Sequence, residues 1–144
     1  MGAVFSAERR FLLPEENNGQ AALLGNSCSA CERMFFPARS VCPYCWDPGT
    51  LSPYRFFGPG RLYAATVIRV APVGFQPPYA IGLVDLPEGV RVMAQLEVEP
   101  SQWNRLSPGM MMELCVGVIR RHEKGQDMMG YKFRMAEGDS EKGK

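Results

Sequence analysis

Two Cys-x-x-Cys pairs constrain this chain more than any other feature of its sequence. Cys28 and Cys31 form the first pair, Cys42 and Cys45 form the second, and ten residues lie between the pairs. Each pair can place two thiolates on one tight turn, and two such turns brought together offer four sulfur ligands in a tetrahedron. The spacing therefore predicts a small metal-binding ribbon, which we expect over residues 26–57.

Four thiolates fill every position of a tetrahedral site, so no position remains for a catalytic water. Soft sulfur ligands suit zinc, and we expect one structural Zn2+ ion that drives folding of a segment with little apolar core. The same ligands could hold a redox iron of the rubredoxin kind, and a pair of disulfides is a further alternative. Paired cysteines of this type indicate metal ligation in a reducing cytoplasm, which is the location we expect.

The residue after the second cysteine of each pair is unusual for a metal-binding turn. That position often carries glycine, because the turn needs a positive φ. Glu32 and Trp46 occupy it here. We therefore expect the two turns to be strained or differently shaped.

The rest of the chain divides by composition into three further parts. Residues 1–25 mix charge with the apolar run 21–24, and we expect one helix there. Residues 58–136 read as strands, and the charged segment 137–144 is expected to be a disordered tail. Hydrophobic residues make up 46% of the 144 positions and the net charge is +1, an ordinary globular balance that gives no long-range attraction to nucleic acid or anionic lipid. No apolar run approaches the ~20 residues of a membrane span.

Five strands are expected after residue 58, and in two of them apolar and polar residues alternate clearly. In the first, Leu62, Ala64, Thr66, Ile68 and Val70 share one face, and in the third Val90, Val92, Ala94, Leu96 and Val98 do. The expected ranges are Arg61 to Val70, Tyr79 to Leu86, Val90 to Val98, Met111 to Arg120 and Tyr131 to Met135.

One helical turn is expected between the third and fourth strands, from Ser101 to Leu106, with Ser101 as its N-cap. Five short strands with a helical insertion at this point fit a Greek-key barrel of the OB type. The predicted class is thus mainly β, with an N-terminal helix, a zinc ribbon and a five-stranded OB-fold barrel.

Several motifs follow one another in a familiar order. Between Leu24-Gly25 and the barrel come the four cysteines and Phe36-Pro37-Ala38-Arg39; Gly58-Pro59-Gly60-Arg61-Leu62-Tyr63 and the run from Pro77 to Gly89 follow. Over about residues 20 to 136 the chain resembles the acyl-CoA-associated OB-fold family with an N-terminal rubredoxin-like zinc ribbon, long filed as a domain of unknown function. Glu32 and Trp46 depart from that family, which usually has a small residue there.

The resemblance implies a partner. Proteins that look like this are small subunits bound to thiolase-superfamily enzymes, whose large subunit carries the cysteine nucleophile. The small subunit completes or shields the acyl-CoA site and holds the complex together. The resemblance thus implies a thiolase-fold large subunit, an α2β2-type hetero-oligomer and a CoA ester bound jointly with that partner. One such system, the thiolase that cleaves 2-benzoylsuccinyl-CoA in anaerobic toluene degradation, has a free-standing small subunit of about this size.

Two features could touch the CoA ester or the partner. Arg39, beside Phe36, could pair with a phosphate as a bidentate donor, or it could be a solvent-facing residue next to a packed aromatic side chain. The apolar, proline-rich loop from Ala71 to Tyr79 contains Phe75 and Tyr79. It could meet the partner, line the mouth of the acyl channel, or simply pack on the end of the barrel.

The remaining reactive residues predict no catalytic site of the chain's own. His122, the one histidine, lies at a strand end that leads into a polar loop. Cys115 lies in an apolar strand-like run, so we expect a buried, inert thiol. No Ser-His-Asp or Cys-His pairing is suggested.

The alternative function is a single-stranded nucleic-acid-binding module, because zinc ribbons and OB barrels both serve that purpose. Tyr63, Phe56 and Phe57 could supply stacking platforms. Such a module also needs a positively charged groove, and the near-neutral charge does not predict one.

Overall fold

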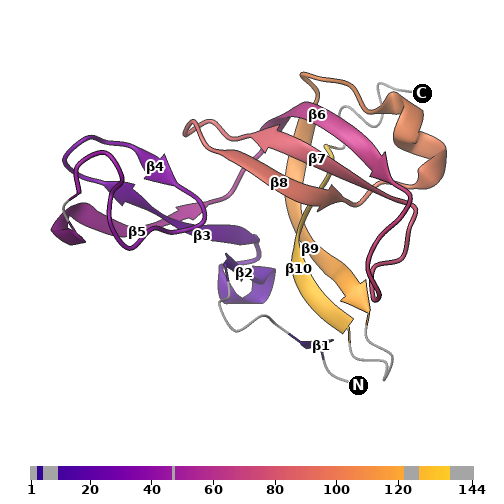
Figure 1. Ribbon diagram of the computed structural model, residues 1–144, viewed down its shortest axis with the longest axis horizontal. Helices are drawn as coiled ribbons and strands as arrows, with labels where there is room; N and C mark the ends of the chain where they lie inside the picture. Colours follow the sequence, from indigo (N-terminus) through magenta and orange to yellow (C-terminus); the bar gives the residue numbers. More distant parts are fainter. Residues whose placement is uncertain (1–2, 5–9, 47, 122–126, 137–144) are drawn as a thin grey trace.

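The computed structural model of this chain describes residues 3–4, 10–46, 48–121 and 127–136. Figure 1 shows two β-structures: a small ribbon sheet built from strands within residues 11–56, and a barrel built from strands within residues 60–135. The mainly β class and the order of ribbon followed by OB-type barrel are as predicted.

The ribbon sheet is organised around one central strand. β3 (Ala22–Cys28) pairs along one edge with β5 (Leu51–Phe56) and along the other with two short strands, β2 (Phe11–Leu12) and β4 (Met34–Phe35). Gly25 of β3 lies directly against Phe35 of β4 and the ring of Phe56 of β5. A Cβ there would overlap the Phe35 carbonyl and lie 2.6 Å from the Phe56 ring, so only glycine lets β4 and Phe56 pack against β3.

The α-helix expected within residues 1–25 does not form in the described part of that segment. The apolar run 21–24 leads into β3 instead, and only a short 3-10 turn, η1 (Pro14–Glu16), precedes it. Ala22 and Leu23 are fully buried, with Leu23 paired to Phe11 on one side and to Phe56 on the other. A short apolar run can be buried equally well as helix or strand, and here the pairing partners on both edges decide.

Five strands close the barrel in the order β6-β7-β8-β10-β9 and back to β6. All neighbours are antiparallel except β8 and β10, which run parallel. A two-residue strand, β1 (Ala3–Val4), adds to the start of β10. The barrel strands are β6 (Gly60–Ile68), β7 (Tyr79–Asp85), β8 (Arg91–Leu96), β9 (Met111–Arg121) and β10 (Asp127–Met135).

The barrel interior confirms the alternation predicted for the third strand and corrects that of the first. Val92, Ala94 and Leu96 are buried on β8, as predicted. Of the residues predicted to share the buried face of the first strand, only Leu62 is buried, whereas Ala64 and Thr66 are exposed and Val70, beyond the end of β6, is 91% exposed. The pairing with β7 shifts between Leu62 and Ala64, so a β-bulge interrupts the alternation, and the strand residues after it are exposed or half-buried on both faces.

The helical turn predicted between the third and fourth strands is present as a 3-10 helix, η3 (Pro100–Arg105). Its N-cap is Glu99, without a side-chain capping bond, so the prediction of Ser101 as cap is wrong. Pro100 fixes the φ of the first helical residue and starts the helix one residue earlier.

Aromatic rings fill the junction between ribbon and barrel. The ring of Phe36 meets Tyr131 of β10 edge-on at 5.4 Å between centroids, and Phe11 meets the same ring at 6.4 Å. The Tyr54 hydroxyl donates a hydrogen bond of 2.9 Å to Glu88 Oε2 in the β7–β8 turn. Phe11, Leu23 and Phe56 of the ribbon sheet belong to the same buried cluster as the barrel interior, so the two β-structures share one core.

Predictions were also made for His122, for the C-terminal tail and for membrane-spanning segments. His122 and the expected disordered tail 137–144 lie outside the described residues. Within the described part of the chain, the helices are short 3-10 turns, and none has the length or the apolar character that crossing a bilayer requires.

Candidate metal centre

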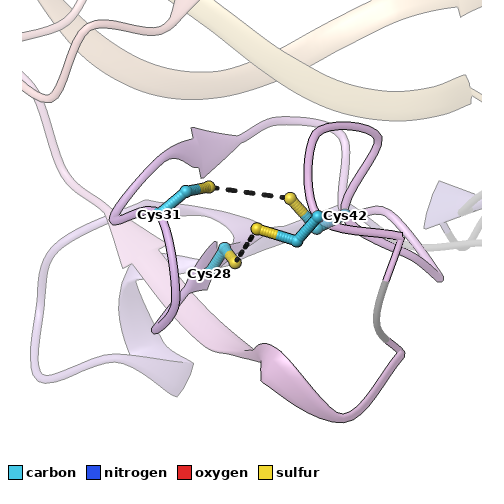
Figure 2. Close-up of side chains that lie close together, drawn as sticks. Cys28, Cys31 and Cys42 are labelled. Atoms are coloured by element: carbon cyan, nitrogen blue, oxygen red, sulfur yellow. Dashed lines mark hydrogen bonds between the residues drawn. The ribbon is translucent and has the colours of Figure 1, made fainter.

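The four paired cysteines come together at the end of the ribbon sheet. Cys28 is the last residue of β3, Cys31 follows on the turn after it, and Cys42 and Cys45 lie on a second turn before β5. Their sulfur atoms all lie within 4.8 Å of one another. Figure 2 shows the side chains of Cys28 and Cys31 from the first turn converging with that of Cys42 from the second. The predicted ligand set is therefore assembled by the fold.

The sulfur separations fit a tetrahedral metal ion. Zinc–thiolate bonds of about 2.3 Å at tetrahedral angles put neighbouring sulfurs about 3.8 Å apart. Cys31 Sγ lies 3.7 Å from Cys42 Sγ, and Cys28 Sγ lies 3.8 Å from Cys45 Sγ. A disulfide needs about 2.05 Å, and all of the cysteines are free. The geometry suits zinc, or iron of similar bond length, and excludes the pair of disulfides.

The two metal-binding turns have the same backbone shape. Glu32 N–H donates to the Cys28 carbonyl at 2.8 Å, and Trp46 N–H donates to the Cys42 carbonyl at 2.7 Å. Both Glu32 and Trp46 adopt a positive φ, 63° and 59°. The expected strain is therefore real, and the alternative of a differently shaped turn is not needed. Side chains larger than hydrogen are disfavoured in this region.

The four cysteines differ in burial, and hydrogen bonding shifts the pKa values of Cys28 and Cys45 in opposite directions. Cys28 and Cys42 are buried, whereas Cys31 and Cys45 are half-buried. The Thr50 hydroxyl lies 3.2 Å from Cys28 Sγ, and because it can donate to a thiolate it helps to lower the pKa of Cys28 to about 6. The hydrogen bond with Cys31, together with burial, raises the pKa of Cys45 to about 12. Metal binding must therefore displace a proton from Cys45.

Thr50 was not predicted from the sequence. It reaches the site from η2 (Pro48–Thr50), 22 positions after Cys28, and no local spacing rule connects the two residues. Asn26 was also missed. Its side chain is buried, donates from Nδ2 to the Arg39 carbonyl at 2.7 Å and accepts from Arg39 N–H at 3.3 Å. Asn26 thus fixes the loop that joins the two metal-binding turns.

The predicted contact residues Phe36 and Arg39 lie on this loop but face different surroundings. Arg39 is exposed, with its guanidinium carbon 6.0 Å from the centre of the Phe35 ring. Phe36 is half-buried between Phe56 and Tyr131, which gives it a packing role at the ribbon–barrel junction. A contact of either residue with CoA or a partner stays a prediction.

The other predicted contact residues, Phe75 and Tyr79, are brought together by their loop. Their rings stack with centroids 6.2 Å apart, and both side chains are half-buried. The Arg120 guanidinium carbon lies 5.5 Å from the Phe75 ring and ties the loop to β9. Val70 and Val73 remain 91% and 77% exposed on the same loop. The loop therefore packs Phe75 and Tyr79 on the barrel and leaves two valines in solvent, and its contact with a partner or with CoA stays a prediction.

Cys115 lies on β9, opposite Lys132 of β10, and away from the metal cluster. It is half-buried rather than fully buried, and burial raises its pKa. A nucleophilic cysteine needs a lowered pKa, because the thiolate is the reactive form. The prediction of an unreactive thiol therefore agrees with its surroundings.

The aromatic residues proposed as nucleic-acid platforms are mostly unavailable. Phe56 is fully buried in the core, and the Arg91 guanidinium lies 3.5 Å above the Tyr63 ring. Phe57 is 38% exposed. The outer groove of the barrel, about 680 Å3, is lined largely by apolar side chains such as Ile68, Ile81, Met93 and Ile119. Among the described residues that line this groove, Arg10 is the charged one, whereas a single-strand site needs a run of cationic side chains beside free rings.

Comparison with known proteins gives two family matches, one over the metal-binding ribbon and one over the barrel. Residues 20–50 match the family model described as ChsH2, rubredoxin-like zinc ribbon domain, and residues 55–117 match ChsH2, C-terminal OB-fold domain. The chain is 34% identical over 124 residues to benzoylsuccinyl-CoA thiolase subunit BbsA of Thauera aromatica, covering 85% of this chain and 83% of the relative.

Two further matches come from an archaeal relative and a solved structure. The chain is 37% identical over 116 residues to a DUF35 domain-containing scaffold protein of Pyrococcus furiosus, covering 78% of this chain and 82% of that protein. A solved Ltp2-ChsH2(DUF35) aldolase matches with a TM-score of 0.60 at 25% identity, over 79% of this chain and 84% of the other.

Proposed function

Because this chain belongs to the ChsH2 (DUF35) family, in which a rubredoxin-like zinc ribbon precedes an OB-fold domain, we propose that it is a non-catalytic accessory subunit of a thiolase-superfamily acyl-CoA enzyme. Its role is to hold the complex together and to complete or shield the acyl-CoA site. The observation that carries the proposal is a metal centre with four protein sulfurs within 4.8 Å of one another, a set that leaves no ligand position for substrate.

The chemistry is assigned to the other polypeptide. In the described residues, the thiol outside the metal cluster is Cys115, and its pKa is raised. The relatives support a partner, since BbsA is named as a thiolase subunit and ChsH2(DUF35) is found with Ltp2 in an aldolase. We assign the same kind of assembly to this chain, an α2β2-type hetero-oligomer with a thiolase-fold large subunit.

The CoA ester is assigned a place between the two subunits. Exposed Arg39 on the ribbon is the proposed partner of a CoA phosphate, with Phe36 beside it. The stacked pair Phe75 and Tyr79 is assigned to the large subunit or to the mouth of the acyl channel. We place the complex in the cytoplasm, because four free cysteine ligands have to remain reduced.

The specific enzyme proposed is a thiolase acting on 2-benzoylsuccinyl-CoA. Support comes from the identity to BbsA, 34% with the Thauera aromatica protein and 29% with that of Geobacter metallireducens. The chain is as similar to the archaeal scaffold protein, at 37% identity, as it is to BbsA, so the experiment has to identify the acyl group directly.

The test is a pull-down of the tagged chain from its native host, with the captured polypeptide identified by mass and then purified. The reconstituted complex is expected to cleave an acyl-CoA thioester in the thiolase direction, with 2-benzoylsuccinyl-CoA as the preferred substrate. The isolated chain should bind zinc and turn over no thioester. Thioester cleavage by the isolated chain would overturn the proposal, and turnover of a different acyl-CoA would overturn only the specific substrate.

A further inference from the structure

We propose that Trp46 is the docking anchor of this chain, and that its indole enters an apolar pocket on the thiolase-fold large subunit. The inference rests on the proposed function and names the contact through which the ribbon holds its partner. It goes beyond the metal centre, because it concerns a side chain that the metal does not use.

The backbone of Trp46 has a structural task, but its side chain does not share it. Its N–H closes the second metal-binding turn on the Cys42 carbonyl, at a φ of 59°. Glu32 performs the same task in the first turn, at a φ of 63°. Because a glutamate and a tryptophan form the same turn, the turn depends on the backbone at this position and not on the side chain. Glycine would satisfy it with less strain, since bulky residues are genuine outliers at positive φ.

Packing does not explain the indole either. Trp46 is 76% exposed. The other tryptophan, Trp103, packs against the barrel core and donates Nε1–H to the Val98 carbonyl at 3.1 Å. The fold thus uses one indole for packing and holds the other in water in a strained conformation. Because Glu32 shows that an exposed polar residue serves the turn equally well, the exposed indole, rather than the shared strain, points to a function outside the isolated fold.

The neighbouring side chains suit a protein partner. Tyr44, two residues before Trp46, is 61% exposed, and the exposed Arg33 lies with its guanidinium carbon 3.7 Å above the Tyr44 ring. We call Arg33, Tyr44 and Trp46 the knuckle patch. Trp, Tyr and Arg are the residue types that dominate binding energy at protein interfaces. The fitting partner surface is an apolar pocket with a carboxylate at its rim, which would pair with Arg33.

The test compares glycine substitutions at the two equivalent turn positions. Trp46→Gly and Glu32→Gly relieve the same backbone strain, and only the first removes the indole. Both variants should keep full zinc content and a thermal midpoint no lower than that of the unmodified chain. Against the purified large subunit recovered by the tagged chain, Trp46→Gly should raise the Kd roughly tenfold or more, and Glu32→Gly should leave it within about twofold. Trp46→Phe should recover part of the lost affinity.

Fluorescence gives a second readout that loss of structure would not imitate. In a Trp103→Phe background, Trp46 is the single indole of the chain, because the sequence contains two tryptophans. Adding the large subunit in a tryptophan-free form should move the emission to shorter wavelength, as the ring leaves water. Unchanged emission on formation of the complex would overturn the proposal.

The other outcomes separate the anchor from its premise. If the unmodified chain binds no thiolase-fold subunit, the proposed function fails and the anchor fails with it. If the complex forms and Trp46→Gly binds as tightly, only the anchor is wrong. A Trp46-dependent self-association of the isolated chain would instead make the patch a contact between copies. A raised KM for the acyl-CoA with an unchanged partner Kd would assign the indole to CoA.

Discussion

The metal end of the ribbon and the interior of the barrel are held together by different means. Around the metal centre the buried cluster consists of Cys28, Phe35 and Cys42, with three half-buried residues against it. The barrel interior is a continuous apolar cluster that includes Leu62, Val84 and Phe133. The first region has too little apolar surface to fold by burial, so it needs a metal ion. The second needs none.

The metal end of the ribbon is connected to the barrel through the rest of the ribbon sheet, whose Phe11, Leu23 and Phe56 belong to the barrel core, and through contacts at the junction. Phe36 packs on Tyr131, and Tyr54 donates to Glu88. Loss of the metal should therefore unfold the metal end of the ribbon first, and it should affect the barrel through the shared core residues and the junction contacts.

Removing the metal should have the largest effect. Binding of zinc to four thiolates contributes on the order of 10 kcal/mol or more, so Cys42→Ser should release the ion and unfold the region around both turns. Zinc analysis and amide hydrogen exchange of β3 to β5 check this. Cys115→Ser is the matched control, because Cys115 lies outside the cluster. A ribbon whose amides stay protected in Cys42→Ser would show that apolar packing alone holds it.

Truncating the barrel core should come second. Phe133 is fully buried, and Phe133→Ala should lower the free energy of unfolding by about 3–5 kcal/mol, because it removes burial and leaves a cavity. Urea unfolding followed by circular dichroism measures the change. Met93→Ala, at a side chain 63% exposed, should stay within about 0.5 kcal/mol. Zinc release at the same urea concentration as barrel unfolding would make the two regions one cooperative unit.

The hydrogen bond between the regions should have a smaller effect. Tyr54→Phe should lower stability by about 1–3 kcal/mol, because Glu88 Oε2 loses its donor while Oε1 already has no partner among the described residues. The double variant with Glu88→Gln shows how much of this belongs to the pair.

The same pair makes a prediction about alkaline pH. The hydrogen bond with Glu88, together with burial, raises the pKa of Tyr54 above 10 in the folded chain. The unfolded chain therefore loses this proton first, and stability should fall as pH rises above about 10. Burial raises the pKa of Tyr131 as well, so Tyr54→Phe should reduce this fall without abolishing it. An identical alkaline profile in the variant would contradict the assignment.

A surface ion pair on the barrel should have the smallest effect. Arg91 Nε lies 2.6 Å from Asp85 Oδ1, but the two side chains are 45% and 42% exposed. Asp85→Asn should lower stability by no more than about 0.2–1 kcal/mol, less at high salt, because solvent screens exposed charges. Thermal unfolding at low and high salt measures it. A larger loss would mean that this pair supports the barrel closure.

The metal site could be predicted from sequence almost completely. Cys28, Cys31, Cys42 and Cys45 carry a local spacing signal, and Glu32 and Trp46 follow from the geometry of the turn. Thr50 and Asn26 could not be found, since each acts on the site across 13 or more positions of sequence. The contact residues Phe36, Arg39, Phe75 and Tyr79 stay predictions, although the structure shows that Phe36 also packs the junction.

In the barrel, too, the sequence predicted what depends on local pattern and missed what depends on distant strands. The alternation in Arg91–Leu96 predicted the strand and its buried face, because one register runs through it. In Gly60–Ile68 a single bulge after Leu62 interrupts the alternation, and the residues after it are exposed or half-buried on both faces. The apolar run that starts β3 was misread as helix, because its partners Phe11 and Phe56 lie far away in sequence.

By itself the sequence determined the four paired cysteines and the number of barrel strands, since both depend on the spacing and pattern of neighbouring residues, and the order of its motifs carried the resemblance to the family. Only the tertiary structure decided which strand faces are buried, which hydroxyl supports Cys28, and that Trp46 is strained and exposed while Trp103 is packed. The physical reason is that spacing fixes local geometry, whereas burial and hydrogen bonding depend on segments that meet only after the chain has folded.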